Sequence, residues 1–233
     1  MNITTNDNKN LETIVDNQKY LRIPIKTHVV MPGDNLIELF KQYLPNEDLE
    51  ENDIVFISEK IVAISQGRAL HIKDVHPRPL ATFLSKYVTK SPHGIGIGMP
   101  ETMEMALREC GTFKILLASA VAAVSKLIGR KGDFYRIAGD KARVIDGPAS
   151  SNIPPFDQYV ILGPNNPDQV SKELKSVFNK NITVVVADIN DLGVNILGSS
   201  DPINIKQLLQ ILKDNPLGQG HYGTPLGIIR KVA

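Results

Sequence analysis

The sequence predicts a globular protein in which helices and β-strands are mixed, and three observations support this. Apolar runs of strand length, rich in valine and isoleucine, occur at 54–57 and 182–187. Apolar residues recur at helical spacing in other segments, such as 35–44 and 167–180. A chain of 233 residues is long enough to bury a substantial core, as one large domain or as two small lobes.

The other elements follow from periodicity and from the residues that punctuate it. Asp34 is positioned to cap the helix at 35–44. The segment 133–145 alternates in polarity and then turns at Asp146 and Gly147, which predicts a strand ending in an acid. The apolar helix at 114–132 is too short to span a bilayer and is predicted to be buried or to face a dimer partner. In chain order we predict strands at 21–30, 54–57, 133–145, 159–164 and 182–187, and helices at 35–44, 76–90, 102–110, 114–132, 167–180 and 205–214.

Composition excludes several classes of protein. A net charge of +1 is too small to attract nucleic acid or an anionic membrane electrostatically, so neither is an expected partner. One cysteine, Cys110, excludes an internal disulfide framework and a multi-cysteine zinc site, and it fits a cytoplasmic location. The start of the chain lacks the pattern of a signal peptide. We expect residues 1–20 to form a flexible tail and 21–233 to form one domain, or two lobes.

Acidic residues follow the apolar run at 182–187. Asp188 comes directly after it, and Asn190 and Asp191 follow before Gly193 permits a turn. Oxygen ligands of this kind suit Mg²⁺, Mn²⁺ or Ca²⁺, although the same residues are also typical of caps and turns. Asp146 is separated from Asp188 by a strand and a helix. Such a crossover brings strand ends to the same edge of a sheet, so the two aspartates are predicted to share one cation.

Two further segments carry residues that suit phosphate. Ser58 and Lys60 follow the strand at 54–57 and can meet phosphate oxygens, although a lysine beside a glutamate, as Lys60 is beside Glu59, is more often a surface ion pair. The glycine-rich loop near the C-terminus offers Gln219 as an oxygen donor, together with several backbone N–H groups. His221 in this loop is a candidate acid or base, or simply an exposed histidine. The alternating Gly94, Gly96 and Gly98 lack the spacing of a phosphate-binding fingerprint.

Four stretches in one order resemble the coenzyme F420 gamma-glutamyl ligases. They are FISEKIVAISQGR, RIAGDKARVIDGPASSNIPP, VVVADINDLG and the closing LGQGHYGTPLGIIR. The likeness covers most of the chain after about residue 22. That family attaches L-glutamate to a deazaflavin coenzyme precursor with GTP and a divalent metal. The resemblance therefore implies a two-lobed, mixed-sheet α+β fold, a homodimer, Mg²⁺ or Mn²⁺, and GTP (or ATP) as co-substrate.

The resemblance also implies roles for individual residues. The implied metal-binding residues are Asp146, Asp188, Ile189 through its backbone, Asp191 and Gln219. The implied nucleotide-binding residues are Ser58, Lys60, Asn152, Leu217, Gly218, Gly220, His221, Tyr222 and Gly223. In such a site the γ-phosphoryl group moves to a substrate carboxylate, and the amine of an incoming amino acid then attacks the acyl phosphate.

The chain departs from the family pattern at several positions. Ile64 replaces the second lysine of the first segment, Ile189 replaces the threonine after the aspartate, and GSSDP replaces a longer segment before the last helix. These changes leave three hypotheses. The first is a ligase that joins an amino acid to a carboxylated small molecule. The second is a non-catalytic, regulatory nucleotide- or metal-binding protein on the same scaffold, and the third is a hydrolase that uses the acids to activate water.

Overall fold

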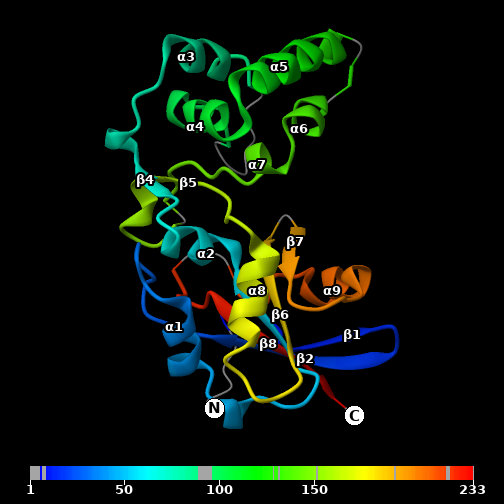
Figure 1. The fold of residues 1–233 in the computed structure, drawn as a ribbon. Helices are drawn as coiled ribbons and strands as arrows, with labels where there is room; N and C mark the ends of the chain where they lie inside the picture. The colour runs from blue at the N-terminus through cyan, green and yellow to red at the C-terminus, as the bar shows by residue number, and fades with distance from the viewer. Residues whose placement is uncertain are drawn as a thin grey trace. The chain divides into compact units, whose positions relative to one another are not determined.

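The chain divides into two compact units (Figure 1). We call them the sheet unit (Met1–Gly67 with Pro164–Ala233) and the helical unit (Arg68–Gly163). The helical unit is thus an insertion in the sheet unit. The structure, a computed structural model, describes residue 6 and residues 9–88, 96–127, 129–130, 132–150, 152–191, 193–218 and 221–232.

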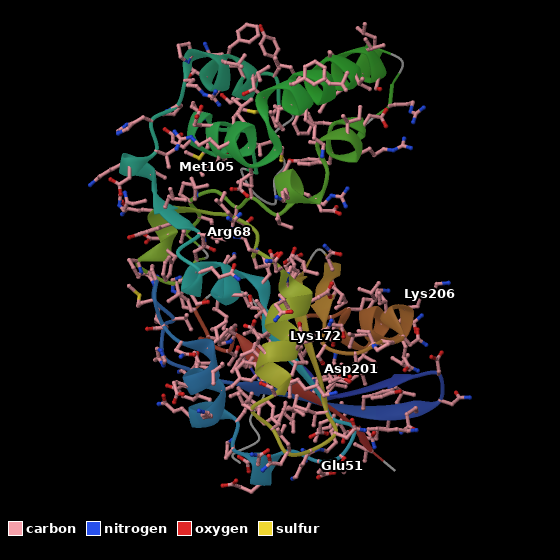
Figure 2. All side chains as sticks on the ribbon, viewed as in Figure 1. Glu51, Arg68, Met105, Lys172, Asp201 and Lys206 are labelled. Atoms are coloured by element: carbon pink, nitrogen blue, oxygen red, sulfur yellow. The ribbon has the colours of Figure 1, made fainter. Side chains whose placement is uncertain are left out.

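Hydrogen bonds join the segment that leaves the sheet unit to the segment that returns to it. In the sheet unit, Gln66 Nε2 donates to Asn165 O at 3.0 Å, and Asn165 N donates to Gln66 Oε1 at 2.8 Å. In the helical unit, Leu162 N donates to Arg68 O at 2.9 Å. Arg68, labelled in Figure 2, also pairs with Glu109 of the same unit. The exit and the re-entry of the chain therefore lie side by side.

The sheet unit is built on a mixed sheet of six strands in the order β1-β2-β8-β3-β6-β7. β3 and β6 are parallel, and the other neighbouring strands pair antiparallel. The predicted strands at 54–57 and 182–187 are therefore central strands of one sheet, as their continuous apolar runs indicate. The strand bounds are β1 Glu12–Val15, β2 Gln18–Ile25, β3 Ile54–Ser58, β6 Thr183–Asn190, β7 Gly193–Ser199 and β8 Leu226–Val232.

Helices cover both faces of this sheet. Phe56 and Val185 belong to one apolar cluster with Leu208 of α9 (Ile205–Leu212). On the opposite face, Gly198 of β7 lies beside Val186, and a Cβ atom at Gly198 would come within 2.4 Å of the Pro167 backbone of α8. Glycine is thus required where α8 (Pro167–Lys175) crosses the sheet. The sheet unit also contains α1 Leu36–Tyr43, α2 Glu59–Ser65 and the 3-10 turn η1 Asn46–Asp48.

The helical unit packs short helices around α4 and α5. Its core includes Met103 and Leu107 of α4 and Ile115 of α5, and Met105, labelled in Figure 2, belongs to the same cluster. Gly111, with φ of +88°, permits the 117° bend between α4 and α5. The elements are β4 Ala69–His71, η2 Ile72–Asp74, α3 Pro79–Ser85, α4 Pro100–Cys110, α5 Thr112–Leu127, α6 Asp133–Ala138, α7 Asp140–Arg143, η3 Phe156–Gln158 and β5 Tyr159–Ile161. Within the described residues, no single helix has both the length and the apolar composition to cross a membrane.

The predicted flexible tail at 1–20 is wrong over its second half. β1 and β2 form an antiparallel hairpin whose turn consists of Asp16 and Asn17, with φ of +52° and +60°. Aspartate and asparagine tolerate this conformation, which hairpin turns of two residues require. The Asp16-Asn17 pair between two alternating segments was the signal for this hairpin.

Two other predictions are corrected. Asn35 caps α1 by accepting a hydrogen bond from Ile37 N, whereas Asp34 accepts from Met31 N at 2.8 Å in the turn before it. The predicted strand at 133–145 is two short helices, α6 and α7, each preceded by a glycine of positive φ and begun by an aspartate. Those glycine-aspartate pairs mark helix starts, and the alternating polarity of the segment concealed them. The strand predicted at 21–30 ends at Ile25.

Candidate functional site

Three segments of the sheet unit meet at the end of β3. Ser58 is the last residue of β3 and pairs with Ala187 of β6, so Asp188 follows directly beside it. Ser58 N also donates to Pro225 O at 2.8 Å, which places the end of the closing loop at the same edge. Ser58 Oγ accepts from Lys60 N at 3.4 Å, so the hydroxyl caps α2. The exit of β3, the acid of β6 and the closing loop therefore converge at the carboxyl end of the parallel pair β3 and β6, and ligands of open α/β sheets bind at the carboxyl ends of parallel strands.

Asp188 lies where β6 runs beyond the end of β3. The prediction that the strand ends at Asp188 is wrong, because β6 continues to Asn190 and pairs there with β7. Asp188 pairs with Asn195, and Asn190 Nδ2 donates to Asp188 Oδ1 at 3.1 Å. Ile189, whose backbone oxygen is an implied metal ligand, pairs with Val194. Asp188 nevertheless follows directly after Ser58 and Ala187, the last residue pair between the parallel strands β3 and β6.

Asp191 is engaged by other side chains. Its Oδ1 accepts from Lys9 Nζ at 2.9 Å and from Asn215 Nδ2 at 2.9 Å. Burial pushes the pKa of the Asp191 carboxyl up, but the bonds from Lys9 and Asn215 outweigh burial, and the pKa lies below its ordinary value. The Asp191 carboxylate is therefore a shared hydrogen-bond acceptor for Lys9 and Asn215.

The closing loop, 217–225, is fixed at both ends. Thr224 Oγ1 donates to Leu217 O at 2.9 Å, and Thr27 N donates to Gly223 O at 2.9 Å. Gly218 and Gly223 have φ of +74° and +69°, which side chains other than glycine rarely adopt. Leu217 is buried, Tyr222 is half-buried and His221 is exposed. Gln219 and Gly220 of the implied site lie outside the described residues.

Lys26 lies against this loop and was not found from the sequence. A Cβ atom at Gly223 would lie 3.7 Å from Lys26 Cε, and Lys26 is exposed directly after β2. Ile25 of β2 pairs with Leu226 of β8, so Lys26 stands at the same edge as Ser58. The sequence did not single it out, because the strand predicted at 21–30 contains Lys26, whereas β2 ends at Ile25.

The two remaining predicted residues belong to the helical unit. Asp146 exchanges two backbone hydrogen bonds of 2.9 Å with Ile161 and is exposed. Asn152 is buried, and its Nδ2 donates to Phe156 O at 3.4 Å. The prediction that both aspartates follow strands of one sheet is wrong. β5 pairs with β4 inside the helical unit, so the chain segment between β5 and β6 leads from one unit into the other and does not connect two strands of one sheet. The shared cation of Asp146 and Asp188 remains a prediction.

The residues at the β3 edge fit a divalent ion that is shared with phosphate. No group of three or more His, Cys, Asp and Glu side chains that could hold a metal occurs in the described part of the chain. Asp188 is the carboxylate that a metal at this edge would bind. Mg²⁺ commonly binds proteins in this way, through one or two carboxylates and the phosphates of the substrate.

Comparison with known proteins adds one match. A family model described as F420-0:Gamma-glutamyl ligase matches residues 24–195 of the 233. The matched range contains Ser58, Lys60, Asp146, Asn152 and Asp188, and it ends before α9 and the closing loop. No curated protein matches the chain.

Proposed function

The chain belongs to the F420-0:gamma-glutamyl ligase family, and from this we propose that it is an amide-forming ligase that uses a nucleoside triphosphate and Mg²⁺ or Mn²⁺. The observation that carries the proposal is the convergence of Ser58, Asp188 and Pro225 at one edge of the sheet unit. The family gives L-glutamate as the incoming amino acid and a carboxylated small molecule as the acceptor.

In the proposed reaction the chain's residues mainly bind and orient. Lys26 and Lys60 would face the phosphates, Asp188 would hold the metal, and the backbone N–H groups beside Gly218 and Gly223 would surround the phosphate oxygens. The bound metal would neutralise charge on those oxygens. The acceptor carboxylate attacks the γ-phosphorus and the nucleoside diphosphate leaves. The amine of the amino acid then attacks the acyl carbon, phosphate leaves, and the amine releases a proton. No side-chain nucleophile is needed, because positioning and charge stabilisation supply the catalysis.

A second candidate function is nucleotide binding without catalysis. Ile64 occupies the family position of a second lysine, and it is a buried side chain of α2. A cation that would face phosphate is therefore replaced by a residue of the apolar core. A protein with this change can retain nucleotide binding through Lys26, Lys60 and Asp188 and lose phosphoryl transfer.

One experiment separates the two candidates. We expect GTP or ATP with Mn²⁺ to raise the melting temperature of the protein, because a ligand that binds the native state stabilises it. For the ligase, phosphate release should require both an amino acid and a carboxylated acceptor. Binding without phosphate release from any such pair would support the non-catalytic candidate. The absence of a shift with both nucleotides would contradict both proposals.

We also propose that the protein is a homodimer and that α5 forms the interface. Ile115 and Ala118 of α5 face the core of the helical unit, yet the opposite side of the helix is apolar as well. A helix that is apolar on both sides needs a second packing partner. Large side chains on this outer side, here called the α5 stripe, are exposed, Phe113 by 81% and Leu127 by 87%. The α5 stripe consists of Phe113, Leu116, Leu117, Ala120, Val124 and Leu127.

The size pattern of the α5 stripe is self-complementary. Its bulky residues lie towards both ends, and Ala120 lies in the middle. If two copies of α5 pair antiparallel about Ala120, Phe113 faces Leu127 of the partner subunit, and the two alanines allow close approach. A twofold dimer requires such a self-complementary surface. The stripe exposes on the order of 500 Å² in each copy, so a pair would bury about 1,000 Å², near the lower limit of a stable interface.

The dimer proposal predicts the result of one charge substitution. We expect Leu117→Glu to convert the dimer to a monomer, because it places a charge in the middle of an apolar contact. Light scattering after size exclusion measures the change. The control is Lys126→Glu, an exposed position of α5 off the stripe, which should remain dimeric. A monomeric wild-type protein, or a dimeric Leu117→Glu variant, would contradict the proposal.

A further inference from the structure

The segment before the family-matched range is held on the sheet unit. Arg22 of β2 is 1% exposed, and its guanidinium donates to Asn10 O at 2.7 Å and to Ile211 O at 3.0 Å. The same group pairs with Asp214. Arg22 N also donates to Leu11 O at 2.7 Å. Through Arg22, the chain before β1 is therefore connected to the end of α9, which precedes the closing loop in the chain.

Asn6 joins the two ends of the closing loop. Its Nδ2 donates to Leu217 O at 2.5 Å and to Thr224 Oγ1 at 2.8 Å. Since Thr224 Oγ1 itself donates to Leu217 O, the three residues form a closed triangle of hydrogen bonds. A Cβ atom at Gly218 would lie 3.5 Å from Asn6 Cβ, so the asparagine also packs on the loop.

Lys9 links the β6–β7 turn to the segment that leads into the closing loop. Its Nζ donates to Asp191 Oδ1 at 2.9 Å and to Asp214 O at 3.0 Å. Asn215, fully buried, donates to the same Asp191 oxygen. Lys9 and Asp191 therefore hold Asp214 and Asn215, which precede the closing loop in the chain.

We propose that Asn6 and Lys9 are positioning residues for the closing loop, and that they tighten nucleotide binding through the loop. The inference rests on the proposed function, in which the loop binds the phosphates. A loop with glycines at positive φ has many alternative conformations when unbound, and ordering it costs free energy on binding. Hydrogen bonds that already hold Leu217 and Thr224 reduce this cost in advance. The segment that carries Asn6 and Lys9 lies before the family-matched range, which begins at residue 24.

The test compares two asparagines of the same segment. Asn6→Ala removes the bonds to Leu217 and Thr224, whereas Asn10→Ala removes an exposed side chain and keeps the backbone oxygen that Arg22 contacts. We expect the dissociation constant for GTP with Mn²⁺ to rise about tenfold in Asn6→Ala and to stay unchanged in Asn10→Ala. Lys9→Met, which keeps the length of the side chain, should weaken binding in the same direction.

Hydrogen exchange of the unliganded protein gives an independent readout. Peptides that cover 217–225 should exchange faster in Asn6→Ala than in the wild type or in Asn10→Ala, while peptides of β3 and β6 stay unchanged. Equal exchange in all three proteins would overturn the inference even if the wild type bound no nucleotide and the proposed function had failed. Faster exchange with unchanged nucleotide affinity would also overturn it, because the loop would then be ordered by Asn6 without effect on binding.

Discussion

Asp188→Asn is expected to lower kcat/KM of the proposed ligase by at least about a hundredfold and to remove the effect of Mn²⁺ on nucleotide binding. In the wild-type protein, Asn190 Nδ2 donates to Asp188 Oδ1 at 3.1 Å. An asparagine at position 188 keeps the shape of the side chain and an oxygen that can accept this bond. What it loses is the negative charge at the end of the parallel pair of β3 and β6. Isothermal titration with GTP, with and without Mn²⁺, measures the loss.

The neighbouring acid provides the matched control. Asp191 contacts Lys9 and Asn215, so Asp191→Asn should lower the melting temperature of the unliganded protein. It should leave the dependence of nucleotide binding on Mn²⁺ in place. If Asp191→Asn abolished the metal effect and Asp188→Asn did not, the roles that we propose for the two residues would be reversed. Unchanged binding in both variants would make them turn residues.

Glu104→Gln is expected to destabilise the helical unit by roughly 2–4 kcal/mol at neutral pH. The side chain of Glu104 is 2% exposed and accepts from Arg78 N at 3.1 Å, Arg78 Nε at 3.0 Å and Arg108 Nε at 2.8 Å. It thus joins the start of α3 to α4 at a buried point. Both arginines are about half exposed and can regain water, so the expected loss is below that of a fully buried pair. Chemical denaturation at pH 7 measures it.

The same carboxylate should make this stability depend on pH. Burial pushes the pKa of Glu104 up, but the hydrogen bonds from Arg78 and Arg108 outweigh burial and hold it below its ordinary value of 4.5. Because the pKa is lower in the folded state, ionised Glu104 stabilises the fold at pH values above its ordinary pKa. This stabilisation is lost as the pH falls below 4.5 and passes through the pKa of the folded state. The stability difference between wild type and Glu104→Gln should therefore shrink towards pH 3. The control is Glu101→Ala, in the first turn of α4, for which the difference should stay small at every pH. A difference for Glu104→Gln that is constant with pH would contradict the assignment.

Elements with strong periodicity were predictable from the sequence, and those that depend on a few turn residues were not. β3, β6 and the helices α1, α8 and α9 carry long apolar patterns, so burial alone specifies them. The β1–β2 hairpin depends on the Asp16-Asn17 turn, and α6 and α7 depend on single glycines. In both places the apolar pattern of the flanking residues is weak, so it does not indicate the correct secondary structure.

The candidate site was predictable in part. Ser58, Asp188 and the closing loop follow or precede strands, and the structure brings these three segments together. Two lobes were among the expected arrangements, but the assignment of β5 to the helical unit was not predictable. The residue pattern of β5 and the following helix is the same whether or not the strand joins the main sheet. Asn6 was also not predictable as a partner of Leu217, since 211 residues separate them.

The insertion of the helical unit has a consequence for the order of events on the ribosome. β3 is synthesised before the whole of Arg68–Gly163, and its parallel neighbour β6 only after it. The nascent chain therefore exposes the edge of β3 while the inserted unit is completed and can fold, because the core residues that the structure describes in that unit all lie between Val75 and Leu162. Contacts between β3 and β6 close a long stretch of chain, so formation of the central sheet is expected to be the slow step. During that interval, the bare strand edges are where a chaperone would act or where chains would aggregate.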